Sequence, residues 1–97
     1  MKNAMSGRET ISTDAASYAV GDPVTVLFTH MPGNLFDRIA IAPSGSPPTV
    51  ITQVDFTQGS VDGRVVFFGL APDTYVARAI LDRSSRVLAE SAPFTIE

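Results

Sequence analysis

A chain of 97 residues is long enough to bury one hydrophobic core and too short for two independent ones. Hydrophobic residues make up 44% and charged residues 18%, a balance typical of a globular protein and unlike that of a disordered segment. The net charge is -3, the basic residues are scattered, and there is no cysteine, which excludes a basic surface for nucleic acid, disulfides and cysteine-ligated zinc.

No apolar run reaches the roughly 20 residues that span a bilayer, so we expect no membrane insertion. The first eight residues lack the apolar stretch of a signal peptide. We expect residues 1–9 to form a flexible N-terminal segment or one introduced by cloning. Residues 10–97 are expected to form the domain.

Short runs of Val, Ile, Phe and Thr alternate with clusters of Gly, Pro, Asp and Ser, which is the pattern of an all-β domain. In chain order the strand candidates are residues 10–14, 24–29, 37–42, 50–56, 64–68, 75–81 and 87–96. Their spacing is near the about 8 to 12 residues typical of a sandwich, and it predicts a Greek-key β-sandwich of about seven antiparallel strands. A five-stranded barrel is the alternative, which would leave two runs unassigned.

The first half of the chain gives the clearest period of two. After the weak first strand, residues 15–17 are expected to let the chain cross between sheets. In the second candidate Val24, Val26 and Phe28 alternate with Thr and Leu and should face the core.

The fifth candidate has four apolar residues in a row, which predicts either burial on both faces or an apolar outer stripe. If alternate residues ending at Leu70 point inward, Val65 and Phe67 point outward. Val76 and Ile80 join them if their strands are neighbours. These four residues are the candidate protein interface. In the last candidate, a proline at position 93 requires an edge position or a bulge.

Leu70, Pro72 and Tyr75 lead into the sixth candidate and resemble the corner of an immunoglobulin-like sandwich. We expect the Tyr75 ring to be buried with its hydroxyl bonded to upstream backbone. The other interpretation, an exposed platform for sugar, is less favoured because the chain has no Trp and only Tyr18 as a second Tyr.

Further positions extend this likeness over residues 17–96. They are Val20, Gly21, Pro32, Gly33, Asn34, Asp37, Ile39, Ala40, Ile41, Ala77 and Arg78. Together they resemble a bacterial immunoglobulin-like or fibronectin type III-like accessory domain, although Arg38 stands where such domains often carry Trp. The resemblance implies a non-catalytic module of a larger secreted or periplasmic protein. Such a module docks or positions a neighbouring domain or a partner protein.

A second hypothesis is a carbohydrate- or calcium-binding module of a secreted enzyme. Its candidate loop residues are Asn34, Asp37, Arg38 and Asp62. Carboxylate and amide oxygens are the ligands that calcium takes, but the spacing of an EF-hand is absent. Aspartates in turns usually accept hydrogen bonds from nearby backbone, which is the simpler interpretation.

Catalysis has little support in the sequence. His30 is the only imidazole, and Asp37 is the only carboxylate near it along the chain. Ser84 and Ser85 have no histidine or lysine nearby to activate them, and the turn at residues 59–63 lacks the lysine of a phosphate loop. We therefore predict that the protein is not an enzyme and uses no cofactor or metal.

Overall fold

The computed structural model describes residues 7–97, and within that range it is built from strands with no helix, as the sequence predicts. Most of the expected N-terminal segment, residues 1–6, lies outside the described part, and Glu9 is already buried. The nine strands are β1 (Thr10–Thr13), β2 (Ser17–Tyr18), β3 (Val24–Thr29), β4 (Arg38–Pro43), β5 (Gln53–Phe56), β6 (Gly63–Phe67), β7 (Asp73–Ile80), β8 (Val87–Glu90) and β9 (Phe94–Ile96).

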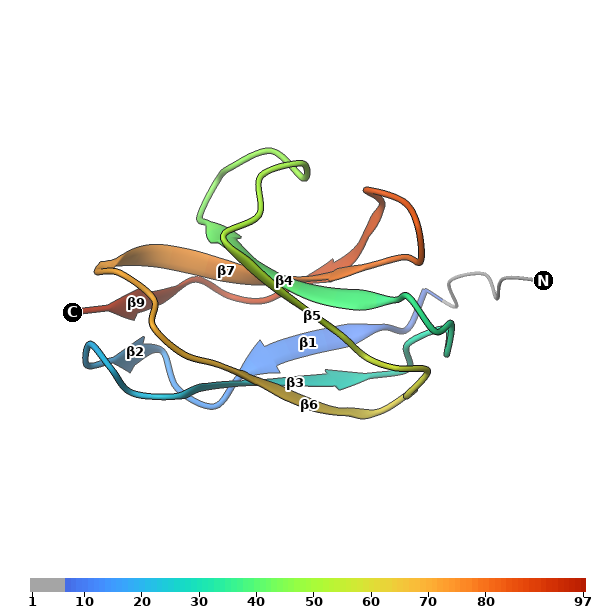
Figure 1. The fold of residues 1–97 in the computed structure, drawn as a ribbon, viewed down its shortest axis with the longest axis horizontal. Coiled ribbons are helices and arrows are strands. Elements are labelled where there is room, and N and C mark those ends of the chain that lie inside the picture. Colours follow the sequence, from blue (N-terminus) through green and yellow to red (C-terminus); the bar gives the residue numbers. More distant parts are fainter. Residues whose placement is uncertain (1–6) are drawn as a thin grey trace.

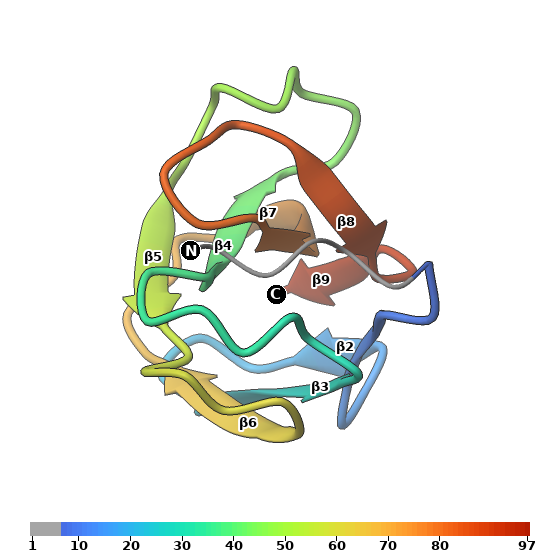
Figure 2. The same ribbon diagram turned by 90° about the vertical axis from the view of Figure 1, so that its right-hand side faces the viewer.

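These strands form two sheets that lie face to face (Figures 1 and 2). One sheet has the order β1, β3, β6, and the other has the order β2, β9, β7, β4, β5, with β8 also paired to β7. The pairing of β2 with β9 is parallel, and the remaining described pairs are antiparallel. The edge strands β5 and β6 lie on the same side of the molecule (Figure 2).

The chain changes sheets between β1 and β2. β1 pairs with β3 in the first sheet, whereas Ser17 and Tyr18 of β2 pair with β9 in the second. Small side chains at Ala15 and Ala16 occupy the crossing, and the Asp14 amide still bonds to a carbonyl of β3. The prediction of a crossing at residues 15–17 is confirmed.

The core lies between the sheets and follows the predicted period of two. Val24, Val26 and Phe28 are buried, as expected. On the facing sheet Ile39 and Ile41 of β4 are completely buried. The first sheet thus contributes one row of inward side chains per strand, and its other face meets solvent.

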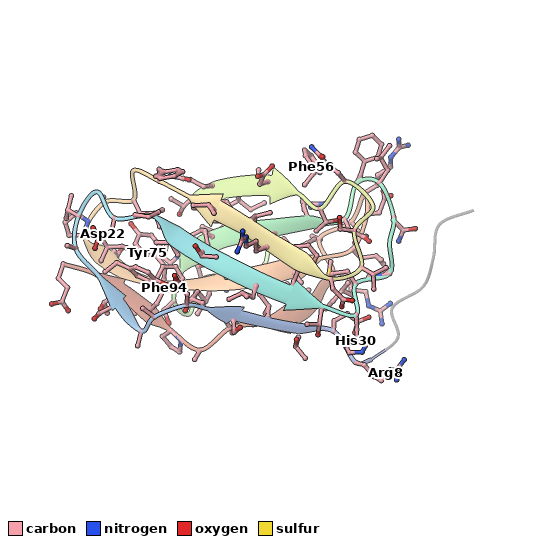
Figure 3. All side chains as sticks on the ribbon, turned by 90° about the horizontal axis from the view of Figure 1, so that it is seen from below. Arg8, Asp22, His30, Phe56, Tyr75 and Phe94 are labelled. Atoms are coloured by element: carbon pink, nitrogen blue, oxygen red, sulfur yellow. The ribbon has the colours of Figure 1, made fainter. Side chains whose placement is uncertain are left out.

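Three aromatic rings fill one end of this core. Tyr75 stacks on Phe94 with ring centres 5.9 Å apart, and Tyr18 meets Phe94 edge to face at 5.8 Å. The Tyr75 ring is buried and its hydroxyl donates to the carbonyl oxygen of Ala71, which confirms the expected burial of the ring and its bond to upstream backbone. Figure 3 shows Tyr75 and Phe94 toward the opposite end of the molecule from Phe56.

The last strand candidate is interrupted and forms two strands, β8 and β9. Between them Ser91 bonds to Ala77 of β7 through both its amide and its hydroxyl. Pro93 has no N–H to give to a ladder, so the strand cannot continue through it. The expectation of one strand over residues 87–96, with Pro93 at an edge or bulge, is therefore wrong, because the strand ends before Pro93. This division accounts for one of the two strands beyond the seven predicted.

The outer face of the second sheet is covered by the loop at residues 44–52, which rises above β4 in Figure 1. Arg78 points from β7 toward this loop and donates to the carbonyl oxygens of Ser46 and Pro47. Its Nε lies 2.8 Å from Oε1 of Glu90 on β8. The buried guanidinium therefore supplies donors to loop carbonyls and holds the loop against the sheet.

Candidate interaction surface

The candidate interface of Val65 and Phe67 lies inside the molecule. Their exposed fractions are 9% and 4%, so the expectation of an outward stripe at these residues is wrong. In the antiparallel register they lie opposite Val26 and Val24 of β3. Directly opposed residues point to the same face of a sheet, and that face is the core.

The error in the predicted orientation arises at Gly69. Leu70 is buried as expected, but Gly69 has a φ of 74°, a left-handed conformation that interrupts the strand alternation between Leu70 and β6. The outward residues of this segment are consequently Val66 and Phe68, with exposed fractions of 39% and 62%.

Val76 and Ile80 are also buried, although they lie on the outer face of β7. Neither belongs to the cluster of buried residues between the sheets. The chain that covers this face buries them together with Arg78, so β7 is buried on both sides. These two residues cannot take part in an interface without displacement of that covering chain.

The four loop residues do not form one ligand site. Asp37 is fully buried, and its carboxylate accepts hydrogen bonds from the Asn34 amide at 2.8 Å, the Asn34 side chain at 3.3 Å and the Asp82 amide at 2.9 Å. Its oxygens are therefore engaged in holding two loops together. Both Asn34 and Asp37 are structural residues in this arrangement.

Asp62 and Arg38 have different surroundings. Asp62 accepts a 2.9 Å hydrogen bond from the backbone amide of His30, and Arg38 donates to the carbonyl oxygen of Ser84. The His30 ring lies 3.0 Å from the hydroxyl of Thr29. Within residues 7–97 no group of three or more His, Cys, Asp or Glu residues is arranged to hold a metal ion.

A different surface stands out around Phe36 and Phe56. Both rings are partly exposed, at 38% and 44%, and they meet edge to face with centres 5.9 Å apart. The guanidinium carbon of Arg83 lies 4.8 Å from the centre of the Phe36 ring, a cation–π contact. These residues and Arg38 line an open pocket of about 270 Å³. We call these four residues the aromatic–arginine patch.

Three elements bring the patch together. Phe56 ends the edge strand β5, directly opposite Arg38 at the start of β4. Phe36 lies in the turn before β4, where its amide donates to the Asp82 carboxylate at 3.3 Å. Arg83 follows Asp82 in the loop after β7. Because Asp37 bonds to the same loop at the Asp82 amide, the buried carboxylate fixes the relative position of the two loops that carry Phe36 and Arg83.

The patch is positively charged although the chain as a whole is acidic. Its two arginines are the only charged residues that line the pocket. Arg83 is 74% exposed, and its Nε lies 3.7 Å from Oδ1 of Asp82, which is longer than a hydrogen bond. The guanidinium therefore keeps N–H groups directed to solvent.

The sequence contained a partial signal for this surface. Phe56 lies in a strand candidate whose inward face the sequence left open, and Phe36 precedes a buried strand within a turn. Such a residue, outside the alternating pattern of a strand, has no face assigned to it by the sequence. The neighbouring arginine of the other loop is 47 positions later in the chain, at Arg83, so only the fold brings it to Phe36.

A second exposed apolar surface lies on the outer face of the first sheet. It contains Leu27 of β3 and the outward Val66 and Phe68. No aromatic ring pair or cation–π contact is found there among the described residues. Val66 shares a pocket of about 390 Å³ with Phe56 of the patch, whereas neither Leu27 nor Phe68 lines that pocket or the pocket of the patch. Leu27 and Phe68 therefore provide a control for the aromatic–arginine patch.

Comparison with known proteins returned no matching family model and no matching curated protein. Within residues 7–97 there is no helix with the length and apolar character needed to cross a membrane.

Proposed function

We propose that the chain is a non-catalytic, immunoglobulin-like module that docks or positions a neighbouring domain of the same polypeptide or a partner protein. The aromatic–arginine patch is the observation that carries the docking role. Paired aromatic rings and arginines are the residue types most enriched in the centres of protein interfaces.

The immunoglobulin-like Greek-key assignment is part of this proposal. It is supported by the strand orders β1, β3, β6 and β2, β9, β7, β4, β5, in which neighbours in a sheet are mostly distant in sequence. It is also supported by the Tyr75 corner at the start of β7. The resemblance to bacterial accessory domains supports a place in a larger secreted or periplasmic protein.

Thermal unfolding of the isolated chain and of its natural full-length polypeptide tests the docking role. If the patch docks a neighbour, the module melts about 4 °C or more higher in the polypeptide than alone, because the contact stabilises only the folded state. Phe36→Ser with Phe56→Ser should abolish that difference. The control is Leu27→Ser with Phe68→Ser, which should leave it intact, because neither residue shares a pocket with Phe56. If the patch instead docks a separate partner protein, the melting temperature of the module should rise only after that protein is added.

The docking role would be rejected if the module melted at the same temperature alone and in the polypeptide. The variant pairs and any partner protein recovered with the polypeptide would then also leave the melting temperature unchanged.

Carbohydrate binding remains the second candidate, because the same two rings offer apolar faces beside arginine donors. Calcium has less support, since the oxygens of Asp37 already accept three N–H groups. A thermal shift screen with soluble glycans and with calcium tests both. Stabilisation by a glycan that disappears in Phe56→Ser would favour the carbohydrate-binding role over docking.

A further inference from the structure

We infer that the aromatic–arginine patch receives an apolar side chain of an acidic segment in the partner, with a carboxylate of that segment bound by Arg83. This inference rests on the proposed docking function and adds the chemistry of the partner. It follows from three properties of the patch: its pocket, its charge and the state of the neighbouring strand edge.

The pocket sets the size and polarity of the inserted group. The pocket is open, has a volume of about 270 Å³ and is lined by four residues, which is room for one side chain of a partner. Phe36 and Phe56 form its apolar walls. An aromatic ring or a branched aliphatic side chain would bury these ring faces and complete the cluster.

The charge of the rim sets the flanking residues of the partner. Arg38 and Arg83 are the charged residues of the pocket wall, and Arg86 is exposed in the same loop as Arg83. The Asp82 carboxylate lies behind Arg83, with Oδ1 3.7 Å from its Nε, and this one negative charge stands against three arginines. The Arg83 guanidinium carbon lies 4.8 Å from the Phe36 ring centre and the side chain is 74% exposed, so its terminal N–H groups can reach a carboxylate of a bound segment. The net charge of -3 makes such a rim a local exception, complementary to an acidic partner.

The edge of β5 argues against the other common way of binding a segment, which is addition of a strand. The Thr57 amide donates to the Asp37 carbonyl at 3.0 Å, so alternation directs the Phe56 amide away from β4. That amide donates to Oδ1 of Asp55 at 2.9 Å. A carboxylate on the edge blocks the donor and repels an acidic strand. The partner therefore binds on the face of the patch.

Selection of peptides from a random displayed library on the immobilised chain tests this inference. Peptides that bind wild type but not the Phe36→Ser, Phe56→Ser variant are kept, which restricts the set to the patch. We expect them to share an aromatic or aliphatic residue flanked by Asp or Glu. A selected peptide should bind about tenfold more weakly to Arg83→Gln, because a charged hydrogen bond is lost. Arg83 is highly exposed, so this variant should keep the fold, which circular dichroism checks.

Reversing the charge of Arg83 tests whether this residue selects acidic partners. Selection on Arg83→Glu should shift the flanking residues of the enriched peptides from acidic to basic. Patch-dependent peptides without acidic residues, or with unchanged affinity for Arg83→Gln, would overturn the inference while leaving the docking function to its own thermal test. Failure to enrich any patch-dependent peptide would also overturn it.

Discussion

The hydroxyl of Tyr75 donates a 2.6 Å hydrogen bond to the carbonyl oxygen of Ala71, four residues earlier in the chain. This bond closes the turn between β6 and β7 and so fixes the point at which the chain passes from one sheet to the other. The ring that carries the hydroxyl is packed on Phe94 in the core. Local turn geometry and core packing thus depend on one side chain.

Tyr75→Phe should lower the free energy of unfolding by about 1 kcal/mol, because the ring stays in place while one hydrogen bond is lost. Tyr75→Ala should cost about 3 kcal/mol or more, since it also removes the ring from the core. Urea unfolding measures both. A Tyr75→Phe variant as stable as wild type would mean that the corner bond contributes nothing to folding.

Stability should fall in alkaline solution because of the two tyrosines. Burial raises the pKa of Tyr75 and Tyr18 above 10.0, and for Tyr18 the hydrogen bond to Asp14 raises it further. Above pH 10.0 the unfolded chain loses these protons while the folded chain retains them, so the stability present below pH 10.0 declines as the pH rises through the folded pKa values.

Urea midpoints measured between about pH 8 and about pH 11, a range that spans the ordinary tyrosine pKa of about 10, test this decline. In the double variant with Tyr18→Phe and Tyr75→Phe it should be much reduced. An alkaline decline of the same size in the double variant would assign it to other groups.

The all-β architecture, the sheet crossing after β1 and the Tyr75 corner could be predicted because each depends on local sequence. Alternation over Val24 to Phe28 identifies an inward face by itself. The orientation of β6 could not be read in this way. All residues from Val65 to Phe68 are apolar, and the left-handed Gly69 changes the parity between them and Leu70.

The candidate surface could not be predicted from the sequence, because it depends on tertiary contacts. The outer face of β7 is covered by a loop whose contacts join Arg78 to Ser46 and Pro47, and no periodicity predicts such a covering. Phe36 belongs to the patch because Arg83 lies over its ring, and only the tertiary structure brings these two residues together. Pairs of this kind lie in loops, where pattern carries the least information.

The orientation of β6 can be tested with an isosteric pair. Val65→Thr should cost about 1 to 3 kcal/mol, because it buries a hydroxyl among apolar side chains. Val66→Thr should change the free energy of unfolding by no more than about 0.5 kcal/mol, since Val66 is at the surface. Equal losses in urea unfolding would mean that both faces of β6 are buried.

Asp37→Asn should destabilise the protein by about 2 kcal/mol or more, because an amide nitrogen cannot accept the N–H groups that the carboxylate now receives. Asp62→Asn is the control, since Asp62 is exposed and accepts a bond from the His30 amide. Ring contacts between Phe36 and Phe56, followed by nuclear Overhauser effects, should weaken in Asp37→Asn alone. Their persistence would show that the buried carboxylate does not hold the patch together.

Arg78→Met should release the loop at residues 44–52 from the outer face of the second sheet. The Arg78 side chain is 5% exposed, so its loss leaves the carbonyls of Ser46 and Pro47 without their buried donor. Glu90 is 48% exposed, and Glu90→Gln should cost less than about 1 kcal/mol because water replaces much of the ion pair. The amide of Val50 bonds to Pro47 within the loop and reports its closure. Hydrogen exchange at Val50 should therefore accelerate strongly in Arg78→Met and little in Glu90→Gln, whereas equal acceleration would assign the closure to the ion pair.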